Sequence, residues 1–150
     1  MKDYDIRECS NEEADFVIDK LVEYNLSKVA STQEIDFLNI DRVVEDVKGN
    51  IIAGILAKMY CWNCLYIDVL WVEEGYRKDG LGSKLLKEIE NIAIEKGCHL
   101  IHLDTFDFQA KDFYIKHGYE VFGVLDECPK KHKRYYLKKL NELAKTPEQK

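Results

Sequence analysis

The segment Leu70–Leu86, LWVEEGYRKDGLGSKLL, decides the fold. It begins as an apolar, strand-like stretch, passes through glycines at Gly80 and Gly82, and continues as an amphipathic pattern. Apolar residues recur in that pattern mostly at spacings of three and four, which predicts a helix: Leu81, Leu85, Leu86, Ile89, Ile92 and Ala93. One short segment therefore contains a strand, a glycine turn and the start of a helix.

This order of elements is suited to holding a phosphate group. The first N–H groups of a helix have no partner within the helix, and the helix dipole makes that end electropositive. Glycine at positions 80 and 82 lets the backbone approach an anion without a Cβ in the way. The segment lacks the glycine-lysine loop of nucleoside-triphosphate enzymes and the three glycines of dinucleotide-binding folds. Taken alone, the motif is equally compatible with a strand-to-helix turn that binds no ligand.

A second segment, residues 98–123, reads CHLIHLDTFDFQAKDFYIKHGYEVFG and follows the predicted helix. We expect a strand over His99–Thr105, a short helix over Gln109–His117 and another strand over Tyr119–Val124. Gly118 is placed to end the helix at its C′ position. The two segments together therefore predict a strand, a helix, a strand, a helix and a strand in succession.

Together the segments resemble the GNAT superfamily of acetyl-CoA-dependent N-acetyltransferases. The first matches the family motif Gln/Arg-x-x-Gly-x-Gly/Ala, although Lys78 stands where many members carry glycine. The second matches Ala-x-x-x-Tyr-x-x-x-Gly-Phe/Tyr, one helix and one strand further on. The residues in register with the two motifs are Arg77, Gly80, Gly82, Ala110, Tyr114, Gly118 and Tyr119. The resemblance is firm over residues 51–125 and looser over the whole chain.

The resemblance implies a single GNAT-like domain over residues 1–140, followed by a frayed tail over residues 141–150. The expected fold is α/β (α+β) in three layers, with a central, mostly antiparallel mixed sheet of six to seven strands flanked by helices. The implied activity is transfer of an acetyl group from acetyl-CoA, as cosubstrate, directly to a primary amine of a small molecule or peptide. The alternative is a non-catalytic acyl-CoA-binding sensor or interaction module on the same fold.

The remaining elements are read from local patterns. Tyr4–Cys9 is suited to a first strand, and a capping box at residues 10–13 predicts a helix through about Leu26. Ser27–Glu34 reads as a loop or an irregular second helix. Further strands are expected over Phe37–Val47, Ile51–Tyr60, Leu65–Val72 and His132–Leu140, with a turn at residues 48–50.

The resemblance also implies how the cosubstrate binds. The backbone N–H groups of about Lys78–Ser83 should hold the CoA diphosphate, and the edge of Leu70–Val72 should pair with the pantetheine amides. Asp107 departs from the family pattern, because many relatives carry asparagine there. The predicted cofactor-binding residues are Leu70, Trp71, Val72, Arg77, Lys78, Asp79, Gly80, Leu81, Gly82, Ser83, Asp107 and Ala110.

Acetyl transfer requires the acceptor amine to lose a proton, and an unperturbed alkylamine has a pKa of about 10.4. The thiolate leaving group must gain a proton or be stabilised. A tyrosine hydroxyl, with a pKa of about 10, is neutral at physiological pH and can donate that proton. The family resemblance assigns this general-acid role to Tyr114. The competing interpretation is that Tyr114 only packs its helix onto the sheet.

The general base is open among four carboxylates: Asp68, Glu73, Glu74 and Asp104. Glu73 and Glu74 lie just beyond a predicted strand end, where a solvated acid is expected. Asp68 lies inside the apolar stretch YIDVLWV, where a carboxylate needs a partner or a function. A structural hydrogen bond and catalysis are both open for Asp68. The predicted catalytic set is Tyr114, Glu73 and Asp68.

Composition narrows the classes of partner. The 150-residue chain has a net charge of −6, and residues 1–50 hold 13 acids against 6 bases. An acidic chain is a poor nucleic-acid binder, because phosphate binding needs clustered Lys and Arg. No apolar run approaches the ~20 residues that cross a bilayer, and the N-terminus lacks a signal-peptide core. We therefore expect a cytoplasmic protein that binds neither nucleic acid nor membrane. The sequence is compatible with a monomer and with a homodimer.

The acceptor itself is not identified by the sequence. The acid-rich first third weakly favours a cationic amine, such as a polyamine, an aminoglycoside or an amino-terminal peptide. The acceptor pocket is expected to come from the first helices, the loop at Ser27–Glu34, the central strand and the region around His132.

Five cysteines, an odd number, are expected as reduced thiols. Cys61-Trp62-Asn63-Cys64 has the spacing of a redox pair or of half a zinc site. It joins two predicted strands instead of opening a helix, and Cys98 and Cys128 lack the spacing of further zinc ligands. Buried thiols at a hairpin end are the favoured interpretation, no metal is expected, and a redox role stays open.

Overall fold

The computed structural model of the chain describes residues 2–141. The chain divides into two compact units, residues 1–31 and 32–150, which are described separately. The first unit contains α1 (Asn11–Lys28). The second contains β1 (Phe37–Asn39), β2 (Arg42–Glu45), β3 (Ile51–Tyr60), β4 (Cys64–Val72), η1 (Glu74–Tyr76), α2 (Leu81–Glu95), β5 (Leu100–Phe106), α3 (Lys111–Lys116), β6 (Glu120–Asp126) and β7 (Lys133–Leu140). No described helix is long and apolar enough to cross a bilayer.

The first unit begins its helix at the predicted capping box. The Ser10 hydroxyl accepts the Glu13 N–H at 3.1 Å, and the Glu13 carboxylate accepts the Ser10 N–H at 2.9 Å. Arg7 pairs with Glu13 and, with the Ser10 N–H, lowers the pKa of that carboxyl to about 2. The helix continues to Lys28, and no second helix follows it before β1.

The strand expected over Tyr4–Cys9 is wrong. Residues 2–10 form no regular element, and no strand of the described chain pairs with them. A lone strand leaves its N–H and C=O groups without partners, so local β propensity is not enough to form one.

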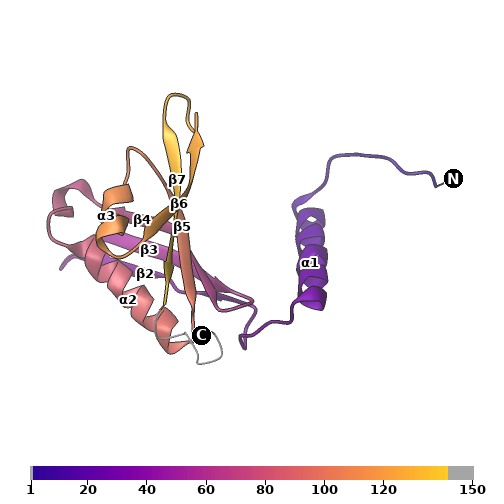
Figure 1. Ribbon diagram of the computed structural model, residues 1–150, viewed down its shortest axis with the longest axis horizontal. Helices are drawn as coiled ribbons and strands as arrows, with labels where there is room; N and C mark the ends of the chain where they lie inside the picture. The colour runs from indigo at the N-terminus through magenta and orange to yellow at the C-terminus, as the bar shows by residue number, and fades with distance from the viewer. Residues whose placement is uncertain (1, 142–150) are drawn as a thin grey trace. The chain divides into compact units, whose positions relative to one another are not determined.

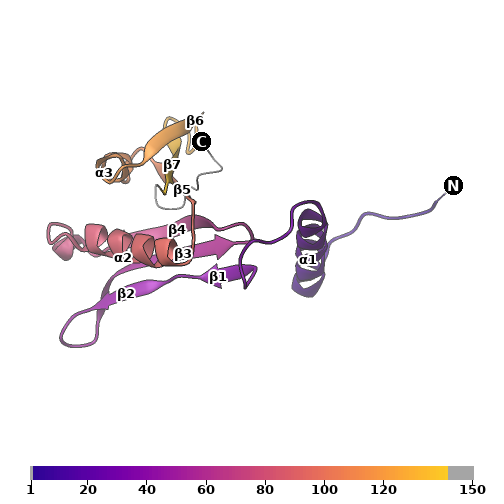
Figure 2. The same cartoon turned by 60° about the horizontal axis from the view of Figure 1, so that its bottom comes forward.

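The second unit is built on a seven-stranded sheet in the order β1-β3-β4-β5-β7-β6, with β2 also paired to β3 (Figure 1). Neighbouring strands are antiparallel except β4 and β5, which are parallel. Helix α2 packs against β2, β3 and β4, and α3 packs against β6 (Figure 2). This arrangement confirms the predicted mixed, mostly antiparallel sheet with flanking helices.

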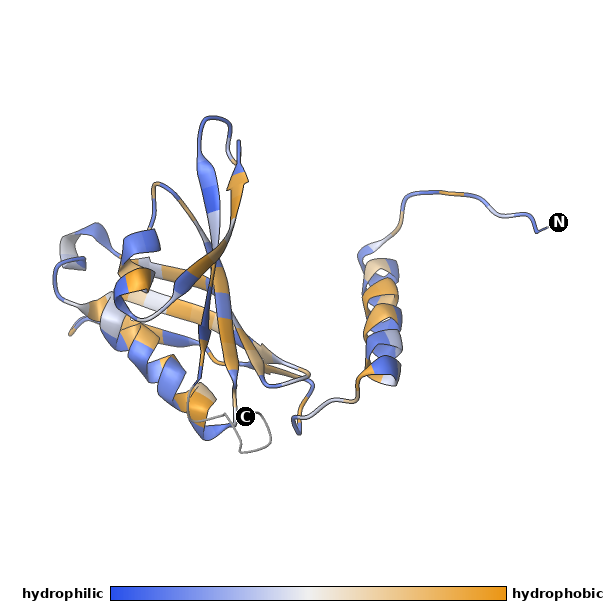
Figure 3. Ribbon diagram, viewed as in Figure 1, coloured by the Kyte–Doolittle hydropathy of each residue, from blue (hydrophilic) through white to orange (hydrophobic). Residues whose placement is uncertain are grey.

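The hydrophobic core lies where α2 meets the central strands, which carry the most hydrophobic residues of the sheet (Figure 3). Leu86 and Ile89 of α2 are fully buried, as are Ile55 of β3, Leu65 of β4 and Leu137 of β7. The apolar spacing read from the sequence therefore marks the face of α2 that packs on the sheet.

The single strand expected over Phe37–Val47 is instead two short strands, β1 and β2. The break falls at Ile40 and Asp41. The Ile40 N–H donates to the Ala57 carbonyl at 2.8 Å, and the Asp41 carboxylate accepts the Ala57 N–H at 3.1 Å. The Asp41 side chain thus takes the place of a backbone carbonyl as partner of the Ala57 N–H in β3, and this separates β1 from β2.

Strands β4 and β5 pair only over their first halves. Their parallel register joins residues 64–67 to residues 100–103. In the β3–β4 register, Leu56 lies opposite Val69 and Ala57 opposite Ile67, so Asp68 is an extra, bulged residue. A bulge bends the strand that contains it. From Asp68 onward, the edge of β4 away from β3 has no partner strand in the described chain.

The Cys61–Asn63 turn joins β3 to β4, with left-handed φ values of 40° at Cys61 and 56° at Asn63. Cys61 and Cys64 are buried and are not joined in a disulfide, and burial raises the pKa of both thiols. This confirms the predicted buried thiols at a hairpin end. Among residues 2–141, no three His, Cys, Asp or Glu side chains gather as a metal site would need. Beyond Asn141, the predicted tail lies outside the described residues.

Candidate active site

A cavity of about 810 Å³ lies between the separated ends of β4 and β5. Its walls are the second half of β4, the turn into α2, the end of β5 and the start of α3. The predicted site residues that line it are Asp68, Leu70, Trp71, Val72, Arg77, Lys78, Gly80, Gly82, Ser83, Ala110 and Tyr114. Glu73, Asp79, Leu81 and Asp107 are not among its lining residues. Residues from both sequence motifs therefore meet in one cavity.

The start of α2 presents free hydrogen-bond donors. Gly80 is the N-cap residue and has φ +75°, a left-handed conformation that disfavours any residue with a Cβ. No side chain caps the helix, and within the described chain the N–H groups of residues 80–83 have no hydrogen-bond partner. A Cβ at Gly80 would meet nothing within 4 Å, so this side of the turn is open. These features fit a bound diphosphate.

Gly82 serves a different purpose from Gly80. A Cβ at Gly82 would lie 3.4 Å from the ring of Phe113 and 3.8 Å from Val72. A Cβ there would already be in van der Waals contact with both residues, so the first turn of α2 lies close to α3 and β4. This close approach brings the free N–H groups of α2 beside the unpaired edge of β4.

The unpaired edge of β4 completes the expected cosubstrate site. Leu70, Trp71 and Val72 pair with β3 on one side only. Their backbone groups on the other side are available to an extended ligand that adds to the sheet edge. Arg77 donates from Nε to the Val72 carbonyl at 3.1 Å and so closes the turn that follows β4. The cavity thus offers an extended edge and then an anion site, in the order that a pantetheine and a diphosphate require.

Tyr114 is buried in α3, with 5% of its surface exposed, and lines the cavity. Its ring centroid lies 5.2 Å from that of Phe113 and 5.6 Å from that of Tyr119. Burial raises the pKa of the Tyr114 hydroxyl to about 12, so it stays protonated at physiological pH. No hydrogen bond engages this hydroxyl within the described chain. Tyr114 is therefore free to donate a proton into the cavity.

The carboxylate candidates are separated by the structure. Asp68 lies in β4, as expected, but it is exposed at the bulge, where it does not need a buried partner, and it lines the cavity. Asp104 also lines the cavity, but its carboxylate is held by Arg134 and by the Tyr66 hydroxyl, the latter at 2.8 Å. Glu73 and Glu74 are exposed at the end of β4 and do not line the cavity.

Several cavity residues were not identified from the sequence. They include Tyr66, Phe106, Phe108, Gln109, Phe113 and Arg134. The alternation of β5 offered one signal, because Asp104 and Phe106 share a face of that strand. Arg134 offered none, because it reaches the cavity only through the pairing of β7 with β5, in which Arg134 lies opposite Phe106.

Asp107 was expected to contact the cofactor, and the structure shows both of its carboxylate oxygens engaged elsewhere. One oxygen pairs with Nδ1 of His132 at 2.8 Å, and the other accepts the Lys133 N–H at 2.8 Å. The Asp107 N–H donates to the Lys133 carbonyl at 2.9 Å. Asp107 therefore ties the turn after β5 to the start of β7.

Comparison with known proteins gives consistent matches. Residues 8–119 match the sequence model of the Acetyltransferase (GNAT) family. An acetyltransferase of Agrobacterium fabrum is 31% identical over 81% of this chain and 84% of its own. Blasticidin-S acetyltransferase of Streptomyces morookaense is 36% identical over 55% of this chain, and the match spans only 60% of that enzyme.

A solved structure agrees with these sequence matches. The crystal structure of an acetyltransferase from Bacillus cereus superposes with a TM-score of 0.84 at 40% sequence identity, covering 92% of this chain and 98% of that one. The family match covers most of the chain, and the structural match extends over nearly all of it. The chain therefore belongs to the GNAT family of acetyltransferases.

Proposed function

We propose that the protein transfers the acetyl group of acetyl-CoA directly to a cationic primary amine of a small molecule or peptide. One observation carries the proposal: a single cavity contains the free N–H groups of α2, the unpaired edge of β4, the Tyr114 hydroxyl and the Asp68 carboxylate. The first two features suit the cosubstrate, and the last two suit the proton transfers of acyl exchange.

Each residue has a defined part in the proposed reaction. The β4 edge and residues 80–83 hold and orient acetyl-CoA, with Arg77 and Lys78 adding positive charge near its phosphates. Asp68 attracts the ammonium group of the acceptor and takes up one of its protons, directly or through water, so that a neutral amine attacks the thioester carbon. As the new N–C bond forms, the nitrogen loses its second proton to solvent, and Asp68 then releases its own proton to solvent. Tyr114 donates its proton to the sulfur as the C–S bond breaks, and solvent then returns a proton to Tyr114.

The alternative of a non-catalytic acyl-CoA sensor requires only the α2 and β4 features. It gives no reason for a buried tyrosine with a free hydroxyl to face the cavity. Acetyl-CoA mixed with a panel of amines separates the two functions, with free thiol and acetylated amine as readouts. We expect thiol release that depends on the amine and equals the acetylated product. Tight acetyl-CoA binding without amine-dependent release would instead establish the sensor.

Asp68 and Glu73 are both candidates for the general base. Asp68 lines the cavity and Glu73 does not, so we expect a loss of activity only when Asp68 is replaced. Asp68→Asn should lower kcat/KM for a cationic amine by about tenfold, a moderate effect because water partly replaces an exposed charge. Glu73→Gln is the matched control and should leave kcat/KM within about twofold. Steady-state kinetics with saturating acetyl-CoA tests this pair. A large loss in Glu73→Gln with none in Asp68→Asn would reverse the assignment.

A further inference from the structure

An aromatic feature of the cavity has no part in the proposed proton transfers. Phe106, at the end of β5, and Phe108, two residues later, have parallel rings whose centroids lie 5.3 Å apart with planes at 4°. His132 lies edge-on to Phe108, with centroids 5.3 Å apart and planes at 83°. The guanidinium carbon of Arg134 lies 5.3 Å from the Phe106 centroid. We call Phe106, Phe108 and His132 the aromatic wall.

The aromatic wall is held rigidly by polar contacts. Asp107 pairs with His132 and binds the start of β7, which fixes the imidazole against Phe108. The side-chain oxygen Oε1 of Gln109 accepts the Phe106 N–H at 2.8 Å, which closes the turn that carries Phe108. Rings fixed in this way lose little conformational freedom when a ligand binds, so they are suited to recognition.

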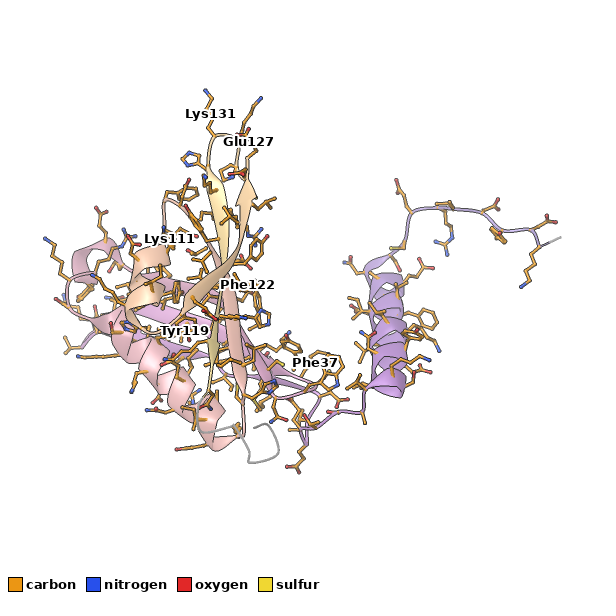
Figure 4. The ribbon with its side chains drawn as sticks, in the orientation of Figure 1. Phe37, Lys111, Tyr119, Phe122, Glu127 and Lys131 are labelled. Atoms are coloured by element: carbon orange, nitrogen blue, oxygen red, sulfur yellow. The ribbon has the colours of Figure 1, made fainter. Side chains whose placement is uncertain are left out.

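Phe108 lines the cavity, and 60% of its surface is exposed. Exposure alone is not informative, because Phe122 on the edge strand β6 is 56% exposed outside the cavity (Figure 4). Phe108 differs in that the Phe106 ring and the His132 imidazole, which pairs with Asp107, support it at the edge of the proposed reaction site. A flat apolar surface in that place would be covered by a bound ligand.

We propose that the aromatic wall is part of the acceptor subsite and that the acceptor is a cationic amine carrying a planar ring. This inference rests on the proposed function. An aromatic ring prefers an offset-stacked or edge-to-face arrangement with another ring. Asp68 supplies an exposed negative charge in the same cavity, whereas Arg134 is already paired with Asp104. The cavity thus offers a ring contact and a carboxylate to a ligand that has a ring and an ammonium group.

Two amines of equal charge and similar size test the inference: 2-phenylethylamine, which is planar at the ring, and 2-cyclohexylethylamine, which is not. For the wild-type protein loaded with CoA, the dissociation constant measured by NMR titration should be about three- to tenfold lower for the planar amine. Phe108→Leu should bring the two constants to within about twofold, while Phe108→Trp should keep the preference. His132→Ala should reduce the preference by removing the support of Phe108.

Phe122→Leu is the matched control, because it removes an equally exposed ring outside the cavity, and it should keep the full preference. Affinity for CoA should be the same in all these variants. Equal binding of the two amines by the wild-type protein would overturn the inference. So would a Phe108→Leu variant that keeps the preference but loses CoA affinity, since Phe108 would then contact the cosubstrate. Because binding is the readout, failure of the inference is separate from failure of acetyl transfer.

Discussion

Replacing Gly80 by valine should lower the affinity for CoA by at least about a hundredfold. The added side chain would stand in the open space beside the free N–H groups of residues 80–83, where we place the diphosphate. Each hydrogen bond to a charged group contributes about 1.5–3 kcal/mol, and every 1.4 kcal/mol is a factor of ten in affinity. Loss of two such bonds therefore gives the expected effect. Titration calorimetry with CoA measures it.

Gly49 provides the control for backbone strain. It has φ +86°, and a Cβ there would also meet nothing within 4 Å, but it lies in the turn before β3, outside the cavity. Gly49→Val and Gly80→Val should each lose about 1–2 kcal/mol of unfolding free energy, because both force a left-handed conformation on valine. Only Gly80→Val should lose CoA affinity. If Gly49→Val and Gly80→Val both fold and bind CoA with equal affinity, the diphosphate does not bind at the start of α2.

Replacing Tyr114 by phenylalanine should slow the chemical step by about a hundredfold, the scale of a positioned general acid. The fold and the CoA affinity should survive, because the Tyr114 hydroxyl has no hydrogen-bond partner within the described chain. The pKa of Tyr114 is raised to about 12, so the wild-type rate should show no loss of this acid between pH 7 and about pH 10. Single-turnover kinetics with an accepted amine measures the step.

Tyr135→Phe is the matched control for this variant. Tyr135 also packs against the hydrophobic core, but it does not line the cavity. The single-turnover rate of Tyr135→Phe should stay within about twofold of the wild-type rate. If Tyr114→Phe retains wild-type single-turnover rates, Tyr114 only packs α3, and the thiolate must be stabilised by backbone groups.

The parts of the site that are local in sequence were predictable. Gly80 and Gly82 are separated by one residue and precede an amphipathic pattern, so a turn into α2 follows from short-range rules. Gly118 ends α3 with φ +92°, as its place after a short helix suggested. Tyr114 lies in α3, before Gly118, and reaches the cavity because only a short turn separates α3 from β5.

The parts that depend on strand pairing were not predictable. Asp68 stood in an apolar strand where a carboxylate would need a partner or a function, and its exposure follows from the register between β3 and β4, which makes it a bulge. His132 and Phe108 meet because β7 pairs with β5, which no local pattern encodes. The failed strand at Tyr4–Cys9 has the same origin, since propensity does not supply a partner strand.

Direct transfer within one cavity is the central claim, and intact-protein mass spectrometry on rapidly quenched mixtures tests it most directly. The protein is mixed with acetyl-CoA, first without and then with an accepted amine, and sampled within one turnover. We predict that the protein mass stays unchanged in both mixtures and that acetylated amine forms only when the amine is present. A protein that gains one acetyl group before the amine is added, and then passes it to the amine, would contradict direct transfer.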